Sequence, residues 1–209
     1  MEEFMLILEL VGIVAFASSG VFIGVKSRLD AFGVCVLGVI TSLGGGFLRD
    51  LTLGVIPPVM FVDRIYGVTA LIVSIVMFIY LKLDKEPLKT IDRLTGVVNI
   101  PDTIGLGIFT VVGAQHAIAA GYGENAFLVI FIGTVTGVGG GVFRDVLTAS
   151  VPYILRKHVY ALASFAGAVI YYIFYYYGLY DWALFCGAMS VIVIRTCASI
   201  WKWDLPRAF

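Results

Sequence analysis

The sequence predicts an all-α polytopic membrane protein whose chain crosses the bilayer seven times. Of its 209 residues, 60% are hydrophobic and 13% are charged, whereas a soluble domain is nearer half apolar and a quarter charged. Seven apolar runs are long enough to cross a membrane as helices. All six prolines lie at or beyond the ends of these runs, where they do not interrupt a helix.

The seven runs define the expected helices in chain order. The first run follows the acidic start Met1-Glu2-Glu3, which lacks the basic residues of a signal peptide, so we expect this run to stay in the mature protein. The remaining runs are separated by short segments that contain proline, glycine or charged residues. The predicted spans cover residues 4–25, 31–53, 61–82, 100–120, 125–148, 158–178 and 182–200.

The basic residues predict the orientation of these helices. The loops on the side of the N-terminus carry one basic residue, Arg64, and the opposite side carries ten. Because cytoplasmic loops are enriched in Lys and Arg, we expect the N-terminus outside and the C-terminus in the cytoplasm. The net charge of zero gives no indication of a nucleic-acid partner, and we expect none. The ten basic residues are Lys26, Arg28, Lys82, Lys85, Lys89, Arg93, Arg156, Lys157, Lys202 and Arg207.

A duplication divides the chain. The segment GGGFLRDL at 44–51 recurs as GGGVFRDV at 139–146, and Tyr66 matches Tyr160 at nearly the same offset. Each repeat holds three spans, and because three is odd, the second repeat must cross the membrane in the opposite direction. Such inverted repeats are typical of transporters. We therefore expect a first repeat at 1–82, a cytoplasmic linker at 83–98, an inverted repeat at 99–179, and a seventh helix with a cytoplasmic tail at 180–209.

The glycine triplets have two interpretations. Each glycine in a helix interior costs about 1 kcal/mol relative to alanine. One interpretation is a kink beside a central pathway, because lipid cannot satisfy freed backbone groups; the other is close helix packing. Since the triplet occurs in both repeats, we favour the kink, with Thr41, Ser42 and Thr136 as pore-lining polar residues. The predicted kink residues are Gly44, Gly45, Gly46, Gly139, Gly140 and Gly141.

Each triplet is followed by an adjacent pair of opposite charges, Arg49-Asp50 and Arg144-Asp145. A charge well inside a membrane span costs at least about 2.5 kcal/mol, so it usually has a partner. Adjacent side chains on a helix do not face each other. We therefore predict that the pairs form between the repeats, Arg49 with Asp145 and Arg144 with Asp50. The alternative is that the side chains extend to the membrane surfaces.

Five further polar residues carry weaker signals. Glu9 and Asp102 occupy matched positions in the first and fourth spans, and a carboxylate near a helix start usually satisfies amide donors there. Gln115 and His116 either line a polar path or form hydrogen bonds between helices. For Arg195 three interpretations stay open: contact with another subunit, a lipid headgroup, or an internal partner.

A chain of this length with GGGxxRD in its second and fifth spans resembles the bacterial branch of the trimeric intracellular cation (TRIC) channel family, also labelled a glycine-transporter domain family. The resemblance implies a homotrimer in the prokaryotic inner membrane, each protomer with its own pore bounded by the second and fifth helices. It implies that monovalent cations pass, K⁺ or Na⁺, with membrane lipid bound and no cofactor. Arg49, Asp50, Arg144 and Asp145 are then on or beside the pathway.

The residues alone do not choose between a channel and a carrier. An arginine-braced constriction can gate a cation pore, and it can equally bind the carboxylate of a small amino acid such as glycine. A non-transporting scaffold does not require duplicated charges inside the membrane. The potassium channel is our leading hypothesis, and the glycine carrier is the alternative.

We expect neither an enzyme nor a metal site. The sequence contains no HExxH motif, nucleophile elbow or P-loop. Its three cysteines, Cys35, Cys186 and Cys197, are isolated within apolar runs. They have neither the spacing of a zinc site nor the even number of a disulfide framework.

Overall fold

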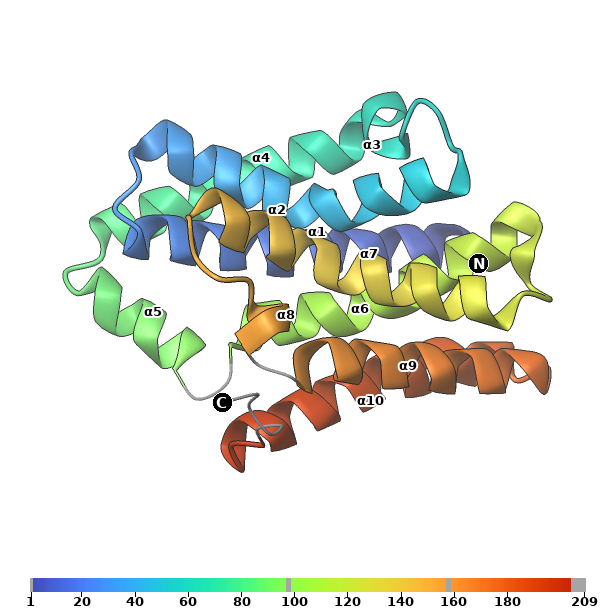
Figure 1. The fold of residues 1–209 in the computed structure, drawn as a ribbon. Helices are drawn as coiled ribbons and strands as arrows, with labels where there is room; N and C mark the ends of the chain where they lie inside the picture. Colours follow the sequence, from blue (N-terminus) through green and yellow to red (C-terminus); the bar gives the residue numbers. More distant parts are fainter. Residues whose placement is uncertain (1, 97–98, 157–158, 204–209) are drawn as a thin grey trace.

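The chain folds into a bundle of seven long helices joined by short segments (Figure 1). The structure is a computed structural model and describes residues 2–96, 99–156 and 159–203. All seven long helices have the length and apolar composition to cross a membrane, so the predicted fold class is confirmed. The elements are α1 (Glu2–Lys26), α2 (Ala31–Leu53), α3 (Val59–Val62), α4 (Arg64–Leu83), α5 (Pro87–Thr95), α6 (Ile100–Ala117), the π-helix η1 (Ile118–Tyr122), α7 (Ala126–Leu147), α8 (Tyr153–Arg156), α9 (Val159–Tyr176) and α10 (Tyr180–Ile200).

The start of the predicted third span, 61–82, is wrong. The apolar residues Val59–Val62 form the separate short helix α3, and the spanning helix α4 begins only at Arg64. Asp63 separates the two helices because its carboxylate accepts a hydrogen bond from the backbone N–H of Ile65 at 3.0 Å. Such a side chain caps a helix start and favours a new helix over continuation of the old one.

Two helices lie at the centre of the bundle. α2 packs against α1, α4 and α7, and α7 packs against α2, α6 and α9. Figure 1 shows α4 along one side of this central pair and α9 with α10 along the other. The core between the two halves includes Phe16 of α1 and Phe109 of α6, which are matched positions of the duplication and whose ring centroids lie 5.3 Å apart.

The outer surface of the bundle is apolar. On α4, Val68, Ile72, Val76 and Ile79 follow one another at helical spacing and are all exposed in the single chain. An apolar stripe of this kind requires lipid or another protein surface as its neighbour. This surface agrees with a membrane-spanning bundle.

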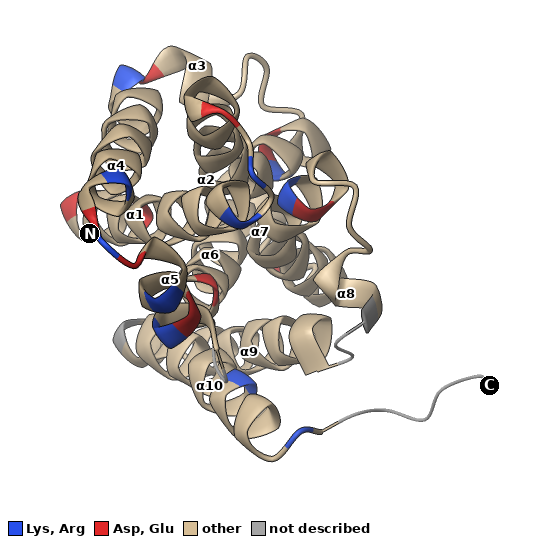
Figure 2. Ribbon diagram, turned by 90° about the vertical axis from the view of Figure 1, so that its left-hand side faces the viewer, with Lys and Arg blue, Asp and Glu red and all other residues tan. Residues whose placement is uncertain are grey.

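The ends of the bundle differ in charge. Figure 2 views the end that carries α5, where Lys26 of α1 pairs with Asp92 at 2.7 Å. Arg64 lies at the opposite end, at the start of α4. Lys157 and Arg207, which belong to the basic side in the sequence, lie outside the described residues. The orientation of these ends in a membrane stays a prediction.

Candidate functional site: two buried ionic clusters

Charged side chains inside the bundle form two clusters. The first, called the Glu9 cluster, lies toward the end of the bundle that carries α3. The second, called the Asp102 cluster, lies toward the end that carries α5. The Glu9 cluster consists of Glu9, Arg49, Asp50, Tyr66 and His116, and the Asp102 cluster of Ser19, Asp102, Arg144, Asp145, Tyr160 and Arg195.

Glu9 is the centre of the first cluster and is only 6% exposed. Its carboxylate accepts a hydrogen bond from the Tyr66 hydroxyl at 2.6 Å and contacts Nε2 of His116 at 2.7 Å. A guanidinium nitrogen of Arg49 lies 3.6 Å from Glu9, while Nε of the same arginine donates to Asp50 at 2.7 Å. Four helices, α1, α2, α4 and α6, therefore contribute to this cluster.

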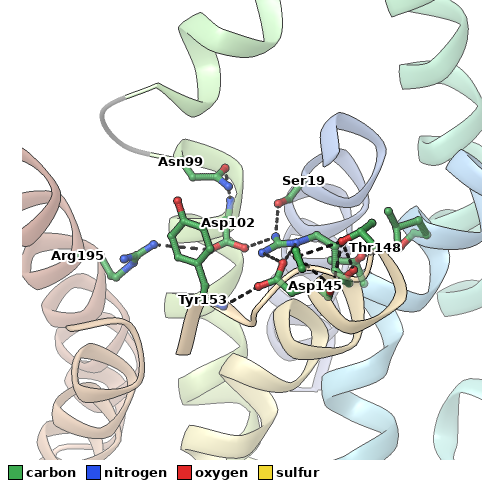
Figure 3. Close-up of polar contacts among 11 residues, drawn as sticks. Ser19, Asn99, Asp102, Asp145, Thr148, Tyr153 and Arg195 are labelled. Atoms are coloured by element: carbon green, nitrogen blue, oxygen red, sulfur yellow. Dashed lines mark hydrogen bonds and ion pairs between the residues drawn. The ribbon is translucent and has the colours of Figure 1, made fainter. Parts of the chain in front are cut away.

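Arg144 is the centre of the second cluster and is 1% exposed. Figure 3 shows Ser19, Asp102 and Asp145 of this cluster. Its guanidinium donates to Asp102 at 2.5 Å, to Ser19 at 2.7 Å and to Asp145 at 2.9 Å. Arg195 of α10 approaches the same cluster, with a guanidinium nitrogen 3.8 Å from Asp102. This arginine–carboxylate network joins α1, α6, α7 and α10 at one point.

The two clusters are built alike. In each GGGxxRD motif, one oxygen of the aspartate contacts the adjacent arginine. The other oxygen accepts a hydrogen bond from the first backbone N–H of a short helix, α3 or α8. Val59 donates to Asp50 at 2.9 Å, and Tyr153 donates to Asp145 at 2.7 Å. Each motif arginine also contacts a carboxylate of the preceding repeat helix, Glu9 in one half and Asp102 in the other. The duplication in the sequence is therefore also a duplication of polar contacts.

The prediction of pairs between the repeats is wrong. Arg49 contacts Asp50 and Glu9, and Arg144 contacts Asp145 and Asp102. α2 and α7 approach each other most closely at Gly45 and Gly140. Arg49 and Arg144 follow these glycines by four residues, which is about 6 Å along each helix. Because the two helices cross the bundle in opposite directions, their charged ends lie on opposite sides of that point. The long arginine side chain instead contacts the adjacent aspartate, which the backbone N–H of Val59 or Tyr153 holds in place.

The helix-start interpretation of Glu9 and Asp102 is also wrong. Glu9 lies beyond the first turn of α1 and contacts side chains of three other helices. Asp102 lies in the first turn of α6, but Asn99 caps that helix, and the Asp102 carboxylate receives Arg144. Both carboxylates are partners for buried cations.

The glycine triplets bring α2 and α7 together. A Cβ atom added at Gly45 would overlap the backbone oxygen of Thr136, and one added at Gly140 would overlap the backbone oxygen of Thr41. Such close approach of backbones is the packing role of small residues between membrane helices. Both helices are α-helical through their triplets. A kink at these glycines stays a prediction, and the alternative of close packing agrees with the structure.

The three polar residues predicted to line a pore have different surroundings. Thr41 and Thr136 are fully buried, and each hydroxyl bonds at 2.6 Å to a carbonyl of its own helix. Ser42 lines a small cavity of about 40 Å³ together with Gly46 and residues of the Glu9 cluster. A polar cavity of this size is large enough for a water molecule.

Several contacts of the two clusters were not predicted from the sequence. Ser19 shows no signal beyond its position in an apolar span, yet it accepts a hydrogen bond from Arg144. Tyr66, which the duplication matches with Tyr160, donates a hydrogen bond to Glu9. His116 also binds Glu9, and Gln115 accepts a hydrogen bond from Tyr171, as the helix-to-helix interpretation of these two residues expected. Within the described residues, no three His, Cys, Asp or Glu side chains group as metal ligands.

Seven apolar helices around duplicated ionic clusters define an integral membrane protein with an internal repeat. The chain belongs to the family described as "Glycine transporter", whose sequence model matches residues 6–82 and 99–176. The two matched segments contain one ionic motif each and leave α10 outside.

Relatives and solved structures agree with this assignment. The UPF0126 inner membrane protein YadS of Escherichia coli K12 is 35% identical over 201 residues, which cover 95% of this chain and 93% of that protein. A solved TRIC cation channel is 36% identical, with a TM-score of 0.84 over 97% of this chain and 96% of that one. A trimeric intracellular cation channel orthologue from Rhodobacter sphaeroides is 26% identical, with a TM-score of 0.84 over 96% and 99%. The resemblance to the prokaryotic TRIC family is thus confirmed.

Proposed function

We propose that the chain is a monovalent cation channel, with potassium as the permeant ion and a separate pathway in each protomer of a homotrimer. The solved structures that it resembles are described as TRIC cation channels, one of them as trimeric. The proposed pathway runs beside α2 and α7, the two helices that carry the glycine triplets and the motif charges. This function is transport and not enzymatic catalysis.

The observation that carries the proposal is the charge of the Glu9 cluster. It contains two buried carboxylates, Glu9 and Asp50, and one guanidinium, Arg49. Among the Asp, Glu and Arg side chains of this cluster, the carboxylates therefore outnumber the guanidinium by one, beside the cavity that Ser42 and Gly46 line. A buried excess of negative charge attracts cations and repels anions. The Asp102 cluster has no such excess, because its two carboxylates face two arginines.

The two clusters differ in arginine–carboxylate distance as well as in charge. Arg49 lies 3.6 Å from Glu9, beyond hydrogen-bond distance, whereas Arg144 lies 2.5 Å from Asp102. We propose that an entering cation replaces Arg49 beside Glu9 and that this arginine acts as a movable gate. The Asp102 cluster would then be a fixed brace at the other end of the pathway.

A glycine carrier is the second candidate, favoured by the description of the family whose model matches. Arg49 would bind the substrate carboxylate. In the present conformation, however, Arg49 already contacts two protein carboxylates, and the adjacent cavity of 40 Å³ is near the size of one water molecule. A carrier would have to open this site before glycine could enter.

We also propose the bacterial inner membrane as the location, with the N-terminus outside. A similar protein of E. coli is named an inner membrane protein. The end that carries α5 holds Lys26, Lys89 and Arg93, whereas the opposite end holds Arg64. Cytoplasmic loops of membrane proteins have this excess of basic residues.

Recording in planar bilayers tests the channel directly. With purified protein and a potassium gradient, we expect discrete current steps that reverse near the potassium equilibrium potential. Proteoliposomes that contain the same purified protein should take up no more glycine than liposomes without protein. Saturable glycine uptake without unitary currents would overturn the channel and support the carrier.

A further inference from the structure

A second, larger cavity opens at the end of the bundle that carries α5. Its volume is 340 Å³, and it lies between the α5–α6 connection, the start of α8 and the end of α10. It shares no lining residue with the cavity of the Glu9 cluster. The residues used in the argument below are Asn99, Tyr153, Arg195, Ser199, Lys202 and Trp203.

Arg195, which lines this cavity, is buried and incompletely hydrogen-bonded. The residue is 3% exposed, and its Nε atom is buried without a hydrogen-bond partner among the described residues. The guanidinium carbon lies 4.6 Å from the centre of the Tyr160 ring, so one face is covered by an aromatic group. Figure 3 shows Arg195 joined to Asp102 by a contact that is 3.8 Å long.

The carboxylate of Asp102, which Arg195 approaches, is paired more closely with Arg144. Asp102 lies 3.8 Å from Arg195 but 2.5 Å from Arg144. Buried N–H groups are nearly always paired, and leaving a donor on a charged group unpaired costs several kcal/mol. Because Arg195 also lines the adjacent cavity and has only this long contact to a carboxylate, its positive charge favours an anionic acceptor there.

The lining of the cavity selects an anion. Lys202 adds a second positive charge, and the described lining residues include no Asp or Glu. Asn99 caps the start of α6 at the same cavity, and the N-terminus of a helix also favours negative charge. An incompletely paired arginine, a lysine and neutral polar groups match the oxygens of a phosphate.

The position of the cavity brings it close to lipid headgroups. It lies at the end of α10, where Ile200 and Trp201 are exposed next to the lining residue Trp203. Exposed tryptophans and lysines at the end of an apolar helix mark the membrane–water interface. A phosphate at this depth is available either on an anionic phospholipid or as a free phosphate compound.

We propose that this cavity binds a phosphate group, with Arg195 as the buried donor and Lys202 at the rim. The phosphate is that of an anionic phospholipid or of a small soluble phosphate. The site shares Arg195 with the Asp102 cluster but no residue with the Glu9 cluster, and its occupancy is measured without any current. The proposal therefore stands or falls independently of cation conduction.

Binding by the purified, delipidated protein tests the proposal. Phosphatidylglycerol, phosphatidylcholine and inorganic phosphate are added separately, and binding is followed by native mass spectrometry and by thermal unfolding. We expect one phosphate source to bind and to stabilise the protein. Arg195→Gln should weaken that binding at least about tenfold, the effect of losing a charge-assisted hydrogen bond. Lys202→Glu should also weaken it, and Lys82→Gln, a basic residue at the same end that does not line the cavity, should not.

The pattern of results identifies the source. Preference for phosphatidylglycerol over phosphatidylcholine, lost in Lys202→Glu, supports a lipid phosphate, and binding of inorganic phosphate alone supports a soluble compound. Equal binding by the wild type, Arg195→Gln and Lys202→Glu, or no binding of any probe, overturns the proposal. If Arg195→Gln does not fold, Lys202→Glu decides, because Lys202 is exposed and follows the last turn of α10.

Discussion

Gly45 on α2 and Thr136 on α7 meet backbone to backbone, so that a single added methyl group at position 45 would overlap the Thr136 carbonyl oxygen. The matched pair, Gly140 and Thr41, has the same relationship. These two contacts hold the central helices together between the Glu9 cluster and the Asp102 cluster.

The first prediction concerns this helix contact. Gly45→Ala should destabilise the protein by about 1–3 kcal/mol, because overpacking against backbone cannot be relieved by a side-chain movement. Gly46→Ala is the matched control, since the nearest atom to an added Cβ there is 3.8 Å away. Thermal unfolding in detergent measures both variants. Equal stability of the Gly45→Ala and Gly46→Ala variants would show that close packing is not the role of the triplet.

The second prediction concerns the partners of Arg144. A double-mutant cycle with Arg144→Gln and Asp102→Asn should give a coupling energy of about 1–3 kcal/mol, because the two side chains are in direct contact. The cycle with Arg144→Gln and Asp50→Asn should be additive to within about 0.5 kcal/mol. Unfolding free energies of the single and double variants supply both values. Strong coupling between Arg144 and Asp50 would restore the pairing between repeats that the structure contradicts.

The third prediction concerns the excess negative charge of the Glu9 cluster. Glu9→Gln removes that charge with little change in shape, so we expect the potassium conductance to fall several-fold. Glu124→Gln, which neutralises an exposed carboxylate at the same end of the bundle, is the matched control and should conduct like the wild type. Single-channel recordings at equal potassium concentrations compare the variants. A wild-type conductance in Glu9→Gln would remove Glu9 from the pathway.

The fourth prediction concerns the linker between the repeats. The Asp84 carboxylate accepts hydrogen bonds from the backbone N–H of Glu86 at 3.0 Å and from the Thr90 hydroxyl at 2.5 Å. These bonds, first the one from Glu86 and then the one from Thr90, lower the pKa of Asp84 below its ordinary value. A pKa that is lower in the folded state stabilises the fold above the ordinary pKa of about 4, and this stabilisation is lost as the pH falls through the folded value.

We therefore expect α5 to loosen in acid. Amide hydrogen exchange of residues 88–95, corrected for intrinsic rates, should show protection falling as the pH decreases from about 6 to about 3. Asp84→Asn should have lower protection at the higher pH and a weaker dependence on pH. A pH dependence in Asp84→Asn equal to that of the wild type would assign the effect to another group.

The sequence predicted the seven spans because membrane helices need long apolar runs, and the structure places a long apolar helix at every one of them. It did not predict the separate helix α3, because Val59–Val62 is as apolar as the span that follows. What divides the two is a local hydrogen bond from Ile65 to Asp63. Hydropathy measures composition and does not detect such a cap.

The duplication also indicated which residues matter but not which of them touch. Arg49, Asp50, Arg144 and Asp145 stood out as repeated charges inside spans, and the structure buries all four. Their partners depend on the rotamers of long side chains and on backbone N–H groups such as that of Val59 at the start of α3. Neither is visible in a pattern of residue types.

The surroundings of Arg195 could not be predicted from the sequence for a related reason. It lies on α10, which has no counterpart in the duplication, so no matched position indicated its surroundings. The approach to Asp102 and the cavity beside it follow from how α10 packs against α6 and α9.

Silver accessibility at position 42 tests most directly whether cations pass beside the Glu9 cluster. In a variant with Cys35, Cys186 and Cys197 replaced by serine, Ser42→Cys places a thiol in the lining of the cavity, and Thr41→Cys places one in the buried helix contact. Silver ions, monovalent cations that react with thiols, are added in potassium nitrate during bilayer recording. We predict that they stop the potassium current of Ser42→Cys irreversibly and leave that of Thr41→Cys unchanged. An unaffected current through Ser42→Cys would contradict a cation pathway beside this cluster.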